Sequence, residues 1–365
     1  MKVRSRLLSI LLVFAASLVP TLVGAQALPA EQAPIDWKLF QSLWLDGVQR
    51  ASADEPLAAK FSEDKAKVFL DDVSLKWVRK NHCGTCHTSV AYLMAHPHFA
   101  RGPKDPAREE VRASVSAFAL DEAKQKTGIS TIIAGAAVAA FTVGDAAGSD
   151  LPADTRTLFD YLWETQNTDG SWSVDAEGLL PFLERDPRYL ALLVTLSAGY
   201  APKEYRLEKT PAAGIERLRG FLRSHPPDNI HDQTVLLWAS VRTPGVLESE
   251  QRSSYLRSLL SLQRADGGWS LPSMGSWQRH GGIPNPIDGP SDGYATALAT
   301  LALCELGVAD AAGPARRGVQ WLRSNQRESG RWFTGSLFAD GFQNYLSNMG
   351  TAYALMAMHR CEPVG

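Results

Sequence analysis

The stretch LLSLQRADGGW at Leu259–Trp269 has two related versions in the chain, LWETQNTDGSW at Leu162–Trp172 and LRSNQRESGRW at Leu322–Trp332. Each version follows a helical pattern and contains Gln-x-x-x-Gly-x-Trp. The Asp-Gly or Ser-Gly pair inside it is typical of a left-handed helix stop. Self-similarity of this kind indicates a repeat architecture.

A second helical pattern follows each stop, and pairing the patterns along the chain gives six helical hairpins. The expected pairs are residues 66–82 with 87–95, 106–126 with 128–143, 153–166 with 187–200, 208–224 with 229–241, 248–263 with 291–306, and 310–325 with 346–360. The second helix of a pair is nearly apolar on all sides, as in TIIAGAAVAAFTV at 131–143, which predicts that it is buried. The first helix carries its charges on one face. This pattern predicts an all-α fold, a single closed (α/α)6 toroid, because an open solenoid would need polar capping repeats.

The N-terminal residues have the pattern of an export signal. Three basic residues precede an apolar core at 7–19, and Val23-Gly24-Ala25 provides a small-residue cleavage site. We therefore expect a signal peptide at 1–25, an extension with a short helix at 26–65 and the toroid at 66–365, in a periplasmic or secreted protein.

Composition limits the classes of partner. The longest other apolar stretch, residues 132–143, falls short of the ~20 residues of a membrane span, so no membrane span is expected. The chain has 37 Lys and Arg against 39 Asp and Glu, and this balance argues against a nucleic-acid partner.

A second motif, His82-Cys83-Gly84-Thr85-Cys86-His87, carries the chemistry. Two cysteines at this spacing can each form a thioether with a haem vinyl group, and the histidine after them can bind the iron. The sequence therefore predicts covalent haem c, with Cys83 and Cys86 as attachment points and His87 as the proximal iron ligand.

Other interpretations of this motif compete with haem. A zinc site would need a fourth ligand, and a thioredoxin-like pair normally sits in a βαβ unit. A plain Cys83–Cys86 disulfide is the main alternative in an oxidising compartment. Cys304 and Cys361 hold the same position in two repeats, so they form either a disulfide between neighbouring helices or two buried free thiols.

The three repeats resemble the QW repeats of squalene-hopene and other triterpene cyclases, whose toroid is shared with protein prenyltransferase β subunits. More closely, the chain is similar to an exported subgroup of cyclase-like proteins with C-x-x-C-H ahead of the first inner helix. In this family the Gln and Trp tie one helix end to the next hairpin, and the resemblance implies the same role here.

The resemblance also implies that the N-termini of the inner helices surround the mouth of a central cavity. The residues expected at this mouth are Cys86-His87, Tyr189, His231-Asp232, Asp292-Gly293-Tyr294 and Asn348-Met349, with the loop 271–290 above them. Converging helix N-termini would make the mouth electropositive and suited to haem propionates, a diphosphate or a carboxylate.

Cyclase catalysis is where the sequence departs from the family. The D-x-D-D acid is missing, and Asp292-x-Tyr294 stands where prenyltransferases have a zinc-binding Asp-x-Cys. The catalytic candidates are Asp186, Asp292 and Tyr294. The candidates for the distal haem ligand are Met274, His280, His231 and Met349.

The sequence thus predicts an exported c-type haem protein with a redox or ligand-binding role, acting on an apolar or isoprenoid molecule and serving an electron-transfer partner. One alternative is a haem-free toroid that binds a lipid, an isoprenoid or a protein partner. Another is a terpene cyclase with a non-standard acid.

Overall fold

The computed structural model describes residues 45–82, 84, 86–99, 105–145, 150–174, 187–277, 285, 287–337 and 343–362, all within one compact unit, Ile35–Gly365. The expected signal peptide at 1–25, like residues 26–44 of the expected extension, lies outside the described residues. Residues 45–62 contain no helix. None of the helices in the described part of the chain is long and apolar enough to cross a membrane.

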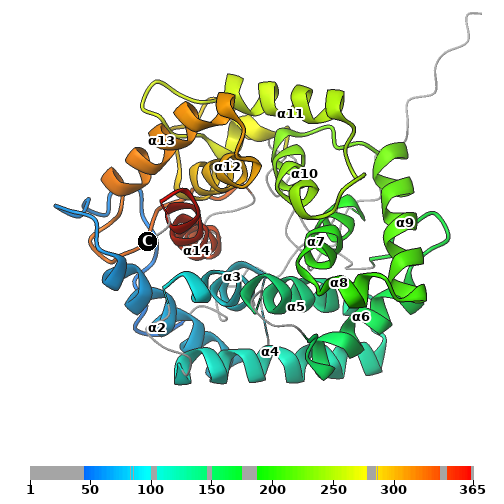
Figure 1. Ribbon diagram of the computed structural model, residues 1–365. Coiled ribbons are helices and arrows are strands. Elements are labelled where there is room, and N and C mark those ends of the chain that lie inside the picture. The colour runs from blue at the N-terminus through cyan, green and yellow to red at the C-terminus, as the bar shows by residue number, and fades with distance from the viewer. Residues whose placement is uncertain are drawn as a thin grey trace, which may run out of the picture. The chain divides into compact units, whose positions relative to one another are not determined.

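Outer and inner helices alternate along this unit and form two concentric rings (Figure 1). The outer helices are α2 (Glu63–Asn81), α4 (Pro106–Gln125), α6 (Ala153–Thr165), α9 (Lys209–Ser224), α11 (Ser249–Ser261) and α13 (Ala309–Ser324). The inner helices are α3 (Ala91–Ala95), α5 (Ser130–Gly144), α7 (Pro187–Tyr200), α10 (Ile230–Arg242), α12 (Gly293–Leu306) and α14 (Gln343–Cys361). Shorter segments are the π-helical turn η1 (Cys86–Val90), the 3-10 turns η2 (His96–His98) and η3 (Leu271–Met274), and α8 (Lys203–Arg206).

The inner ring is closed. Each inner helix packs against the next one in chain order, and α14 packs against both α12 and α3. Glycines allow this close approach: a Cβ at Gly144 would collide with the Leu93 carbonyl, and one at Gly350 would lie 2.9 Å from the Tyr294 nitrogen. The predicted (α/α)6 toroid and its six hairpins are therefore confirmed.

The three QW repeats make one set of contacts. The indole nitrogens of Trp172, Trp269 and Trp332 each donate to the carbonyl ten residues earlier, at 2.7–2.9 Å, which fixes the end of the repeat's own outer helix. The repeat glycines have φ of +90° to +96°, and a Cβ on any of them would collide with a backbone carbonyl of the next outer helix. Glycine is thus required both by its backbone angle and by its neighbour.

The repeat glutamines reach to the next outer helix. Gln166 Nε2 donates to the Gly214 carbonyl of α9, and Gln263 Nε2 to the Pro314 carbonyl of α13. Gln326 accepts from the Ser62 backbone nitrogen at 2.7 Å and donates to the Ser62 carbonyl at 2.8 Å, at the start of α2. The third repeat therefore joins the last outer helix to the first, and the tying role expected from the family is confirmed.

Residues 45–62 pack over this junction. Arg331 is fully buried, and its guanidinium donates to the Glu55 carboxylate and to the carbonyls of Gln49 and Arg50, at 2.8–3.0 Å. A buried charge is tolerated only when it is paired and hydrogen-bonded in this way. The segment is therefore part of the toroid unit.

Cys304 and Cys361 form a disulfide, with their Cα atoms 5.3 Å apart. It joins the C-terminal ends of α12 and α14. The sequence left two outcomes open for these equivalent positions, a bridge or two free thiols. The structure thus decides for the bridge.

Replacing Gln326 with Ala should lower the free energy of unfolding by about 2–3 kcal/mol, because it removes three hydrogen bonds of a fully buried side chain and takes away the acceptor of the Ser62 backbone nitrogen. Gln263→Ala, at the half-buried equivalent position, is the matched control and should cost about 1 kcal/mol. Urea unfolding measures both. An equal loss of unfolding free energy in the two variants would show that Gln326 contributes no more to stability than Gln263.

Peptide mapping without reductant should recover Cys304 and Cys361 in one linked peptide pair. Replacing both with Ser should lower the free energy of unfolding by about 2–4 kcal/mol, since the bridge closes a loop of 57 residues. Free thiols that map to Cys304 and Cys361 in the unfolded, unreduced wild-type protein would refute the bridge.

Candidate functional site

The C-x-x-C-H segment lies between the first outer helix and the first inner helix. Helix α2 ends at His82, whose φ of 52° is left-handed and whose backbone nitrogen donates to the Val78 carbonyl. The turn η1 then begins at Cys86 and runs into α3. Cys83 and Thr85 lie outside the described residues, and of Cys86 only the backbone is described. The motif therefore opens the first inner element, as expected.

His87 lies beside an aromatic wall. Its ring centroid is 6.3 Å from that of Tyr345, and the Tyr345 ring meets the buried Trp77 edge-on at 5.6 Å. Thr88, the next residue, accepts a hydrogen bond from the Asn348 side chain at 3.1 Å. Helices α2 and α14 thus hold the segment that carries the histidine.

Two buried donors next to the motif have no acceptor among the described residues. They are the indole nitrogen of Trp77 and the amide nitrogen of Asn81, both in the last turns of α2. An unpaired buried N–H is costly, so such groups indicate a place for an acceptor that is bound from outside the chain. A haem propionate is an acceptor of this kind, so the residues around His87 fit the group.

The predicted residues His231 and Tyr294 are joined by a buried hydrogen bond, and His231 also contacts Asp232. His231 Nδ1 lies 2.8 Å from Asp232 Oδ1, and its Nε2 lies 2.8 Å from the Tyr294 hydroxyl. An ionised Asp232 places the ring proton on Nδ1, so Nε2 accepts from Tyr294. Burial acts to raise the pKa of Asp232, but the hydrogen bonds from His231 and Asn229 outweigh it and the pKa is lowered. His231 would have to give up one of these partners before it could bind a metal.

Asp292 caps α12. It is fully buried, and its two oxygens accept from the backbone nitrogens of Ala295 at 3.0 Å and Leu271 at 2.5 Å. Burial raises its pKa to about 6. Asp292 therefore ties η3 to the start of α12, which is a structural task, and no reacting group is needed to explain its place.

The remaining described candidates, Met349 and Met274, come from different elements. Met349 follows Asn348, so it comes from the helix that holds the His87 segment. Met274 is fully buried in η3, which packs against α10 and α12. Asp186 and His280 lie outside the described residues. Of the described distal candidates, Met349 is the one whose own helix contacts η1.

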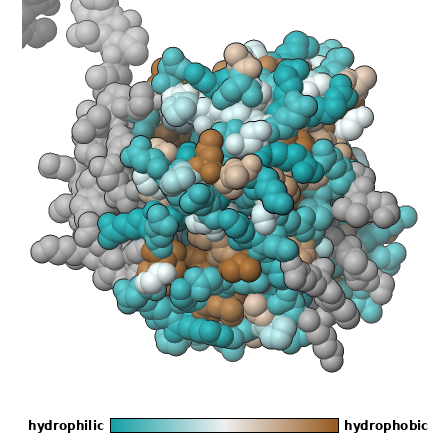
Figure 2. Space-filling model, turned by 90° about the vertical axis from the view of Figure 1, so that its left-hand side faces the viewer, coloured by the Kyte–Doolittle hydropathy of each residue, from teal (hydrophilic) through white to brown (hydrophobic). Residues whose placement is uncertain are grey.

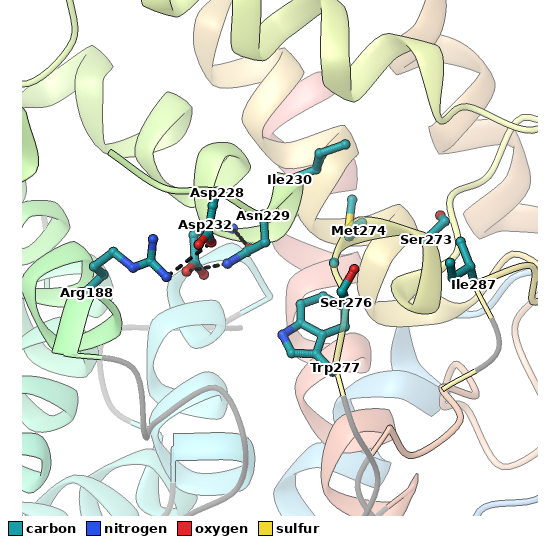
Figure 3. Close-up of a pocket in the computed structure, with 11 residues that line it drawn as sticks. Arg188, Asp228, Asn229, Ile230, Asp232, Ser273, Met274, Ser276, Trp277 and Ile287 are labelled. Atoms are coloured by element: carbon teal, nitrogen blue, oxygen red, sulfur yellow. Dashed lines mark hydrogen bonds and ion pairs between the residues drawn. The ribbon is translucent and has the colours of Figure 1, made fainter. Parts of the chain in front are cut away.

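A cavity of about 590 Å³ lies at the mouth between α7, α10 and η3 (Figure 3). Its polar wall contains Arg188, Asp228, Asn229 and Asp232. The facing wall contains Met274, Ser276 and Trp277 (Figure 3). Sequence reasoning placed Asp232 and the loop 271–290 at the mouth but did not single out Trp277 within that loop. It also missed Arg188 at the start of α7 and Asp228 before α10, which share no local pattern.

A second cavity of about 580 Å³ lies at the opposite end, where all six inner elements end. Its buried Glu305 carboxylate contacts Arg242 at 3.3 Å and Arg360 at 3.1 Å. Arginines at helix C-termini offset the negative end of the helix dipoles. His98 lies in the same lining, with its ring 6.0 Å from that of His359.

The stability of the protein should depend on pH through His98. Burial, and then the positive charges of His359 and Arg360, lower its pKa to about 4. The unfolded state, with a His pKa near 6.5, binds more protons between these values, so stability is lost as the pH falls through this window. Urea unfolding at about pH 7 and about pH 4 should show that His98→Asn loses about 2 kcal/mol less than wild type. The same loss in both proteins would contradict the assignment.

The C-terminal part of the chain contains the inner helices α12 and α14 and two of the three QW repeats. Residues 239–362 match the squalene-hopene cyclase C-terminal domain. The match spans about a third of the chain and confirms the predicted cyclase resemblance there. A search of curated protein sequences gives no match.

A similar solved structure supports the fold. The solved structure UGL_D88N/dGlcA-Glc-Rha-Glc has a TM-score of 0.53 and 13% identity, covering 82% of this chain and 95% of that one. A polysaccharide lyase has a TM-score of 0.46 and 14% identity, covering 82% and 97%. Identities this low concern the fold alone.

Proposed function

We propose that this chain is an exported c-type haem protein built on a squalene-hopene-cyclase-like toroid, with a redox or ligand-binding role. The observation that carries the proposal is the motif His82-Cys83-Gly84-Thr85-Cys86-His87, whose last two residues begin the first inner element, η1. Export is part of the proposal, because covalent haem attachment in bacteria takes place outside the cytoplasm.

Each residue near the motif has a task in this proposal. Cys83 and Cys86 would form the two thioethers, and His87 would bind the iron on the proximal side. Tyr345 and Trp77 supply an apolar wall beside His87. The unpaired donors of Trp77 and Asn81 supply hydrogen bonds for a propionate. A bound haem supplies one-electron exchange, or small-ligand binding when its sixth position is open.

The other finer expectations follow from this proposal. Met349 is the first distal ligand to test, because its helix packs against η1. An electron-transfer partner and an apolar or isoprenoid molecule remain proposed partners. Terpene cyclisation receives less support, because both oxygens of Asp292 are engaged with backbone nitrogens.

The proposal is tested on the mature chain produced in a host that attaches c-type haem. We expect a reduced-minus-oxidised spectrum with a sharp α band and a haem-sized mass increment that survives denaturation. Cys83→Ser with Cys86→Ser should abolish the covalent increment, because both thioethers are lost.

Replacing Cys304 and Cys361 with Ser is the matched control, since it removes the other two cysteines at the far end of the ring. The control should keep its full haem increment. The proposal would be overturned by a colourless wild-type protein whose mass is two hydrogens below that expected for the chain with the Cys304–Cys361 bridge. That mass would show that Cys83 and Cys86 form a disulfide.

A further inference from the structure

The mouth cavity between α7, α10 and η3 has no part in the proposed haem attachment. Its lining comes from the start of α7, from α10 and the two residues before it, from η3 and the three residues after it, and from Ile287, whereas His87 is held by α2 and α14. At about 590 Å³ it has the size of a small-molecule site. A ligand there is therefore a question separate from the haem.

The polar wall is fixed in advance. Asn229 caps α10 and exchanges two hydrogen bonds with Asp232, from its side-chain nitrogen at 2.9 Å and to its side-chain oxygen at 2.8 Å. Asp232 is 3% exposed and is held on its other oxygen by His231. A carboxylate has about four acceptor sites, so Asp232 keeps acceptor capacity beyond these two partners. The carboxylate is thus held rigid where it lines the cavity.

The charged groups of this wall are one arginine, Arg188, and two carboxylates, Asp228 and Asp232. Arg188 lies 3.1 Å from Asp228, whose side chain is 76% exposed. Arginine offers five N–H donors in a fixed fork, and an exposed carboxylate accepts from solvent or from a ligand hydroxyl. Both carboxylates would repel a strongly anionic ligand. An apolar ligand would desolvate these polar groups without replacing their hydrogen bonds, which is unfavourable. The wall therefore suits a neutral ligand rich in hydroxyl groups.

The facing wall offers a flat apolar surface. The Trp277 ring packs so closely on Gly275 that a Cβ there would lie 2.7 Å from it. The same ring meets His231 edge-on at 6.2 Å. Trp277 is thus held in place while it lines the cavity opposite Asp232 (Figure 3). A fixed indole can stack against the C–H face of a ring.

We propose that the mouth cavity is a binding site for a neutral saccharide, with one sugar ring stacked on Trp277 and its hydroxyl groups bonded to Asp232, Asn229 and Arg188. A pyranose combines an apolar C–H face with hydroxyl groups around its edge, which matches one apolar wall facing one polar wall. The site does not depend on haem, so it can be tested on protein with or without the cofactor.

The test uses cellotetraose, maltotetraose, xylotetraose, mannotetraose and chitotetraose with the mature wild-type protein. Saturation-transfer NMR and calorimetry should find at least one that binds with a Kd of about 0.1–1 mM. Trp277→Ala should weaken its binding at least about tenfold by removing the stacking surface. Ser276→Trp is a second variant at an exposed position, and it should block the cavity without disturbing the fold.

Asp228→Asn and Asp310→Asn form a matched pair, because both acids are exposed and only Asp228 lines the cavity. The first should weaken binding and the second should leave it unchanged. No binding of any of the five sugars at about 10 mM would overturn the proposal. So would binding that survives both Trp277→Ala and Ser276→Trp, or a preference for farnesol that is lost in these two variants.

Discussion

The toroid depends on the contact between Gln326 and the start of α2. In the other two repeats the glutamine joins outer helices that already follow each other in the chain. At Gln326 the same side chain joins Ser62, 264 residues away, and Arg331 beside it anchors Glu55. This junction closes the outer ring, as the packing of α14 against α3 closes the inner one.

Closure of the ring determines which side chains lie together at the mouth. The segments before the inner helices bring together side chains from distant parts of the chain, and capping residues such as Asn229 and Asp292 hold them by backbone hydrogen bonds. His87 and Trp277 thereby lie at separate places on the ring, one held by α14 and the other beside α10. The same rim thus has room for a cofactor and for a second ligand.

Local patterns predicted the hairpins well, because each repeat stops its helix with a glycine and each inner helix is apolar throughout. The start of α2 lies slightly earlier than predicted, since Ser62 caps it through Lys65. The Cys304–Cys361 bridge could not be decided from sequence, because helix spacing leaves both outcomes possible. Trp277 was not singled out within the loop 271–290, because only the folded ring brings the distant His231 beside its indole.

The long reach of the Gln326–Ser62 contact also determines the order in which the molecule can be assembled. Contacts between distant residues are slow to form, because the intervening chain must first be ordered. The first outer helix has no partner on its open side until the third repeat has been synthesised. A nascent chain that lacks the last hairpin therefore contains five of the six hairpins, in a ring that is still open beside the first outer helix. The ring becomes complete only after the last hairpin is available.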